Sequence, residues 1–154
     1  MISQISRNPR YAAVFLRAAL GFSFLSAVAD RFGLWGAYGQ PHVAWGDFSH
    51  FVVYVGKLNW FVPAPAIPAI AWMATAAETA LGVALLLGVF PRLIAALSGI
   101  LLLTFAVTMT LALGIKAPLD ASVFSASAGA FLLAVLSVRS PSPADGDSNS
   151  PVRF

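Results

Sequence analysis

The sequence predicts an all-α integral membrane protein: a four-helix bundle that crosses the bilayer, with an amphipathic outer-face helix in its first loop. Composition is the first indication, because 59% of the 154 residues are hydrophobic and only 10% are charged, whereas about a quarter of a soluble domain is charged. The second indication is that four apolar runs are each long enough to cross about 30 Å of hydrocarbon. A soluble chain of this size could not bury so much apolar surface in one core, so lipid must solvate it.

The four predicted spans cover residues 11–29, 66–89, 93–115 and 119–138. We expect each to be a helix, because a segment in lipid must satisfy its own backbone hydrogen bonds. Pro91 and its neighbours allow only a short turn, which makes the second and third spans an antiparallel hairpin. These spans and their connections form one predicted domain over residues 1–138. Residues 139–154 are rich in Ser, Pro, Asp and Gly, which predicts a disordered tail.

The first span has an alternative interpretation as a cleaved signal peptide. Arg7 and Arg10 precede its apolar run, and residues 27–29 (Ala-Val-Ala) resemble a signal-peptidase site. Cleavage there would leave three spans. Arg17 argues for a retained span, because the apolar region of a secretory signal rarely contains a charge.

The distribution of basic residues predicts that both termini lie in the cytoplasm, since cytoplasmic segments carry the excess of Lys and Arg. In that orientation the inner segments hold Arg7, Arg10, Arg92, Arg139 and Arg153, and the outer segments hold Arg31, Lys57 and Lys116. The same residues are too scattered to form a nucleic-acid interface, so we expect no nucleic-acid partner.

Residues 30–65 are too long and too aromatic for a simple connection. Tyr and Trp favour the membrane interface, where the ring is buried and its polar group is hydrated. Residues 47–58 show helical periodicity with Asp47 as the N-cap, which predicts an amphipathic helix. We expect this helix to lie on the outer face of the membrane or to be partly tucked over the bundle.

Glu78 and Arg17 are the charged residues that lie well inside the predicted spans, away from their ends. A carboxyl group at the middle of a span costs about 2.5–3.5 kcal/mol on insertion scales, so Glu78 should face the interior with a partner or be protonated. The depths of the two residues differ by about 6–9 Å at 1.5 Å per residue, which a long Arg side chain could bridge. The sequence therefore predicts an interior Arg17–Glu78 pair; the alternatives are an Arg17 that reaches the head groups and a structural Glu78.

Small residues accompany these charges. Gly21 follows Arg17 by four positions and Gly82 follows Glu78 by four, a spacing that lets two helices approach closely. Gly88 and Gly129 complete the predicted set of helix-packing glycines.

A second group of polar residues is expected on the outer side: His50, Tyr54, Lys57, Lys116 and Asp120. His and Tyr could hydrogen-bond a quinone carbonyl, and His could relay protons, which suggests a head-group or quinone pocket. The alternative is a hydrated polar face. The chain has no cysteine, which excludes dithiol chemistry. Its two histidines are too few ligands for a metal site.

Two stretches resemble the DoxX family of small bacterial inner-membrane proteins. Residues 16–25 (LRAALGFSFL) are similar to the family's opening helix, and residues 77–88 (AETALGVALLLG), followed by Arg92, are similar to its Glu-xxx-Gly, Leu-Leu-Gly and Arg signature. The likeness covers roughly residues 11–138. It departs from the family at residues 27–31, where many relatives carry a Gly and a Lys, and in the longer aromatic loop.

The resemblance implies a multi-pass protein of the bacterial inner membrane, since some members are subunits in quinone-linked sulfur oxidation and others associate with redox and stress-defence proteins. Our leading hypothesis is a non-catalytic or quinone-binding subunit of a membrane redox complex, with no covalently bound cofactor and with quinone and a redox protein as partners. The alternatives are a small transporter or permeability factor that uses Glu78, and a purely structural membrane protein. The sequence does not specify an oligomeric state.

Overall fold

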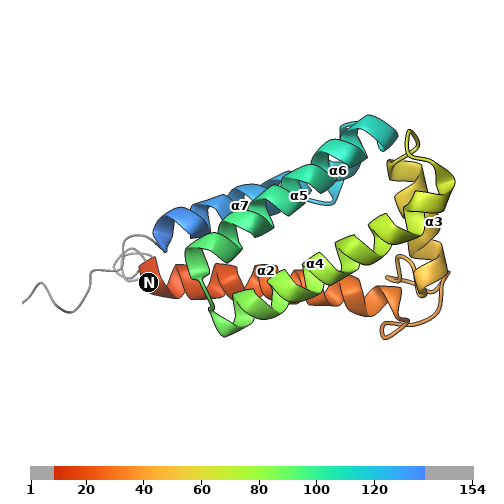
Figure 1. The fold of residues 1–154 in the computed structure, drawn as a ribbon. Helices are drawn as coiled ribbons and strands as arrows, with labels where there is room; N and C mark the ends of the chain where they lie inside the picture. Colours follow the sequence, from red (N-terminus) through yellow and green to blue (C-terminus); the bar gives the residue numbers. More distant parts are fainter. Residues whose placement is uncertain (1–8, 138–154) are drawn as a thin grey trace, which may run out of the picture.

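The computed structural model describes residues 9–137, and all regular structure among them is helical. In chain order the helices are α2 (Pro9–Arg31), α3 (Phe48–Leu58), the 3-10 turn η1 (Ala64–Ala66), α4 (Ile67–Leu87), α5 (Pro91–Leu113), α6 (Lys116–Asp120) and α7 (Val123–Leu136). Figure 1 shows α2, α4, α5 and α7 side by side, with α3 across one end. The predicted tail at residues 139–154 lies outside the described residues.

Three helices are long and apolar enough to cross a membrane: Arg10–Arg31, Ala64–Leu87 and Pro91–Leu113. They correspond to the first three predicted spans. The membrane-protein character expected from composition therefore has a structural basis in continuous apolar helices of bilayer length.

The structure does not confirm the fourth predicted span, because residues 119–137 do not form one continuous helix. The chain there forms the short α6, turns at Ser122, whose φ is +55°, and then forms α7, which has 14 residues. A helix of that length extends about 21 Å. The hydropathy of the run did not reveal the break, although Asp120 and Ser122 are of types that favour caps and turns over helix interiors.

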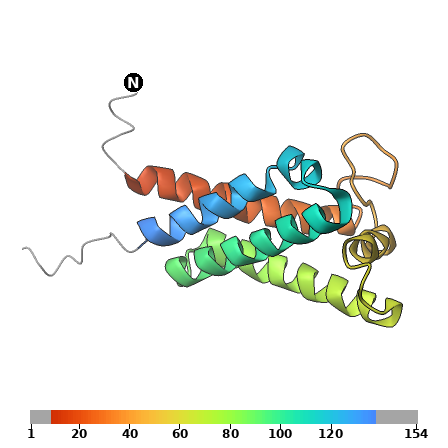
Figure 2. The same ribbon diagram turned by 90° about the horizontal axis from the view of Figure 1, so that it is seen from above.

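The four longer helices pack in pairs: α2 lies along α4, and α5 lies along α7. The pairs are joined because α7 also packs on α2 and α4 also packs on α5 (Figures 1 and 2). Leu20, Phe24, Leu85 and Leu133 are buried where these helices meet. This arrangement leaves most of the remaining apolar side chains on the outside, as lipid contact requires.

The close approach of α2 and α4 depends on two glycines that face each other. A Cβ added to Gly21 would lie 3.0 Å from the carbonyl oxygen of Gly82, and one added to Gly82 would lie 3.2 Å from that of Gly21. Gly88 ends α4 in the left-handed region (φ +73°), a common helix C-cap. At Gly129 an added Cβ would meet Leu16 at 3.3 Å, so α7 and α2 are also close there.

Helix α3 covers one end of this assembly. Its N-cap is Asp47, whose carboxylate accepts the backbone N–H of His50 at 2.9 Å and also pairs with the ring Nδ1 of that residue. These bonds hold the pKa of Asp47 below its ordinary value. Phe51, Val55 and Leu58 form the buried face of α3, which packs on α2, α4 and α5.

Candidate functional site

The centre of the site is a buried ion pair between α2 and α4. The Nη2 group of Arg31 donates to both carboxylate oxygens of Glu78 at 2.7 Å, and its Nη1 group donates to the hydroxyl of Thr75 at 2.9 Å. Both charged side chains are 3% exposed. Charges so deeply buried are stable only as partners, so each fixes the position of the other.

The predicted pair of Arg17 with Glu78 is therefore wrong, because Arg31 occupies that role. Helices α2 and α4 are antiparallel, and the guanidinium of Arg17 lies beside Gly88, at the C-terminal end of α4. Glu78 is ten residues away, about 15 Å along the helix axis. Arg31, by contrast, lies beside the middle of α4.

The sequence predicts Arg31 outside the first span, because the apolar run ends at Ala29. The helix in fact continues through Arg31, and its side chain turns back between α2 and α4.

Aromatic rings cover the guanidinium on the side of α3. Its central carbon lies 3.7 Å from the centre of the Phe51 ring and 5.3 Å from that of Trp45, which is cation–π geometry. Asp30 holds Trp45 in place, because its Oδ2 accepts the backbone N–H groups of Ala44 and Trp45 at 2.9 and 3.0 Å. The loop before α3 is thus tied to the end of α2 beside the ion pair.

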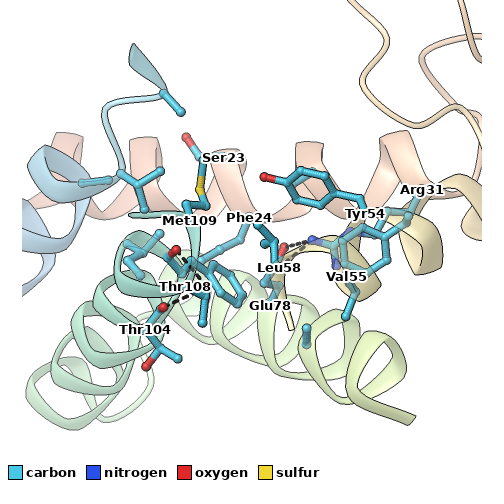
Figure 3. A pocket seen from close by; sticks show the side chains of 18 of the residues that line it. Ser23, Phe24, Arg31, Tyr54, Val55, Leu58, Glu78, Thr104, Thr108 and Met109 are labelled. Atoms are coloured by element: carbon cyan, nitrogen blue, oxygen red, sulfur yellow. Dashed lines mark hydrogen bonds and ion pairs between the residues drawn. The ribbon is translucent and has the colours of Figure 1, made fainter. Parts of the chain in front are cut away.

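A cavity of about 420 Å³ adjoins the ion pair. Figure 3 shows Glu78 and Arg31 toward one side of it and Thr104, Thr108 and Met109 of α5 toward the other. The remaining lining is almost entirely apolar and comes from α2, α3, α4, α5 and the chain at the start of α7. Its volume lies in the range of 300–1,000 Å³ that is typical of ligand pockets.

Tyr54 supplies a polar group to this cavity. Its hydroxyl points toward the side where Ser23 and Met109 lie (Figure 3) and has no hydrogen-bond partner among residues 9–137. Burial raises the pKa of Tyr54 above its ordinary value of 10.0, so the hydroxyl keeps its proton at neutral pH. It is a free donor in an apolar space.

The structure does not gather the other predicted pocket residues at the cavity. His50 stacks on Tyr38, with ring centres 3.7 Å apart, and pairs with Asp47. Lys57 is exposed on α3. Lys116 and Asp120 pair with each other on α6. Tyr54 alone of the five predicted residues lines the cavity.

No group of three or more His, Asp or Glu side chains within residues 9–137 could hold a metal ion. Comparison of the chain with protein-family models, with curated proteins and with solved structures finds no match. The features of the chain that bear on its function are therefore the cavity, the buried ion pair and the tyrosine hydroxyl.

Proposed function

We propose that this chain is a DoxX-like membrane protein that binds a quinone-class lipophile in its interior cavity and serves as a non-catalytic subunit of a membrane redox complex. The single observation that carries the proposal is the apolar cavity with a charge-paired Arg31 on its wall and the unpartnered hydroxyl of Tyr54 within it. An apolar pocket with a few oriented polar groups is the usual form of a small-molecule site.

The charges of the site favour an uncharged ligand. Glu78 matches the charge of Arg31, so the pair presents little net charge to the cavity. A charged ligand would have to give up its hydration without a free counter-charge. Tyr54 can instead donate a hydrogen bond to a carbonyl or hydroxyl oxygen on an apolar ring. A quinone carries such an oxygen.

We infer four membrane crossings, made by the three bilayer-length helices and the shorter apolar α7, with both termini on the cytoplasmic side and α3 at the outer face. Because Arg31 is engaged inside the protein, it no longer counts among the basic residues of the outer segments. Lys57 and Lys116 then remain outside, against Arg7, Arg10, Arg92, Arg139 and Arg153 inside. The bias toward cytoplasmic termini is accordingly larger than the sequence alone indicated.

The proposal also requires a partner. A chain without cysteine carries no thiol-based redox centre, and a quinone-binding subunit needs a partner protein to exchange electrons with the bound ring. The bacterial inner membrane, which contains such complexes, is the location that the DoxX resemblance implies.

The test is ligand binding by the purified protein. We expect protein isolated in mild detergent to retain a quinone, identified by solvent extraction and mass spectrometry, and to bind added quinone saturably. Tyr54→Phe should weaken that binding about 2–13-fold, because one neutral hydrogen bond contributes about 0.5–1.5 kcal/mol. Tyr38→Phe is the matched control, since Tyr38 lies outside the cavity lining. Protein that retains no quinone and shows no saturable binding would contradict the proposal.

A further inference from the structure

We propose that the cavity opens sideways into lipid at the break between α6 and α7, and that its ligand is a long-tailed membrane lipid whose head lies at the Arg31 end. The tail would leave between α2 and α5. This inference rests on the proposed function and specifies which members of the quinone class the site accepts.

The cavity is closed where the ion pair lies and open where α6 meets α7. At the closed end Arg31, Phe51 and Glu78 are 3%, 4% and 2% exposed. Elsewhere on the lining, Ser23 of α2 and Ala121, the residue just after α6, are exposed. Thr104 of α5 is also exposed, but it lies on the side of α5 away from Ser23 (Figure 3). Lining residues that are also exposed mark the mouth of a cavity.

The mouth exists because α7 does not extend over the outer part of the fourth predicted span. Helix α7 packs on both α2 and α5: Ser127 donates to the carbonyl of Gly99 on α5, and Gly129 lies close to Leu16 of α2. It therefore separates α2 from α5 as far as its first residue, Val123, which lines the cavity. There the chain turns away into α6, which packs on α5 and α7.

The hydroxyl-bearing residues Ser23, Thr104 and Thr108 of the cavity lining are compatible with a hydrocarbon tail. The hydroxyl of Ser23 donates to the carbonyl of Ala19, that of Thr104 to Ile100, and that of Thr108 to Thr104 and Phe105. Each hydroxyl is thus satisfied by its own helix. These residues therefore present mainly carbon atoms to a ligand.

The size of the cavity also favours a ligand whose tail extends out of it. At about 420 Å³ it lies near the lower end of the ligand-pocket range. One ring and a few further carbons fill it, so a longer tail must pass through the mouth and lie against the lipid-facing surface.

Two probes that share a head group test the inference on the full-length protein in lipid nanodiscs, by titration calorimetry. One is tailless 2,3-dimethoxy-5-methyl-1,4-benzoquinone, and the other carries a decyl chain on the same ring. We expect wild-type protein to bind the decyl probe at least tenfold more tightly. Ala121→Trp should remove at least tenfold of the decyl affinity and change the tailless affinity by less than twofold. Ala80→Trp, on an exposed part of α4 outside the lining, is the matched control and should change neither.

Ser23→Leu narrows the same mouth from α2 and serves if Ala121→Trp fails to fold in a thermal unfolding assay. Equal affinity of the wild type for both probes, or equal losses for both probes in the mouth variants, would overturn the lateral mouth and leave the quinone site standing. Binding of neither probe by the wild type would overturn the proposed function, and the mouth with it.

Discussion

Replacing Glu78 by Gln is the most informative change, because it removes the charge that balances Arg31 while keeping the size of the side chain. Arg31 donates two 2.7 Å hydrogen bonds to the carboxylate, and both side chains are 3% exposed. Breaking a buried pair by removing one partner typically costs about 3–5 kcal/mol. The Gln carbonyl can keep one of the two bonds, so we expect a loss near 3 kcal/mol in the free energy of unfolding.

The assay is reversible unfolding in mixed micelles, with tryptophan fluorescence as the signal. The double variant Arg31→Met/Glu78→Leu should lie within about 1 kcal/mol of wild type, because replacing both members of a buried pair by apolar residues is often neutral. Thr75 tolerates the loss of Arg31, since its hydroxyl still donates to the carbonyl of Ala71.

The control is a second cycle that joins Arg17→Met with Glu78→Gln. Because Arg17 lies beside Gly88, about 15 Å along α4 from Glu78, the two changes should add within about 0.5 kcal/mol. The reasoning is refuted if Glu78→Gln alone leaves the unfolding free energy within about 1 kcal/mol of wild type, or if Glu78 couples to Arg17 more strongly than to Arg31.

Three further predictions follow from the packing, the α3 cap and the transport alternative. Gly21→Ala should destabilise the protein by about 1–3 kcal/mol in the same unfolding assay, because its Cβ would lie 3.0 Å from the carbonyl oxygen of Gly82. Gly56→Ala is the control, because its Cβ would meet Ile67 at an ordinary 3.7 Å, and it should stabilise the protein by about 0.5–1 kcal/mol. Equal changes in unfolding free energy for the two variants would contradict the close approach of α2 and α4. The depressed pKa of Asp47 means that its ionised form stabilises α3 above the ordinary value of 3.8, and that this contribution disappears as the pH falls through the lower native value. Amide hydrogen exchange in α3 should accelerate, relative to the intrinsic rate, over that acid range in wild type and stay insensitive to pH in Asp47→Asn. A proton or substrate flux into liposomes that vanishes with Glu78→Gln would favour a transporter, whereas we expect flux equal to that of empty liposomes.

The helices that hydropathy defines were predictable because lipid contact leaves a strong local signal. Residues 66–89 were predicted as the second span, and α4 occupies Ile67–Leu87. The end of α4 at Gly88 is set locally, since a glycine with positive φ accommodates a helix C-cap. The predicted helix at residues 47–58 likewise corresponds to α3 at Phe48–Leu58 with Asp47 as its cap.

The partner of Glu78 was not predictable in the same way, because it depends on how far α2 slides along α4. Arg17 could approach Glu78 only if both helices began at one membrane plane. In the structure α2 extends beyond the C-terminal end of α4, so Arg17 reaches only Gly88 and Arg31 reaches the middle of α4. That offset is determined by tertiary packing, above all by the contact of Gly21 with Gly82.

The cavity also arises from long-range packing. The sequence predicts a ligand contact for Tyr54 from its hydrogen-bonding capacity. It does not show that Tyr54 lines one cavity with Thr108 and Ala121. The break at Ser122 is a backbone feature that hydropathy averages over, and it decides where the cavity meets the surface.

The separation of Arg31 and Glu78 along the chain has a consequence for biosynthesis. The two residues are 47 positions apart, and a ribosome adding about 5–20 residues per second needs roughly 2–9 s to make that stretch. During this interval the guanidinium of Arg31 lacks the carboxylate with which it pairs in the folded protein, and hydrocarbon strongly disfavours an unpaired charge. The newly made segment must therefore wait near the head groups or inside the insertion machinery, and it can settle to its final depth only when its acidic partner arrives.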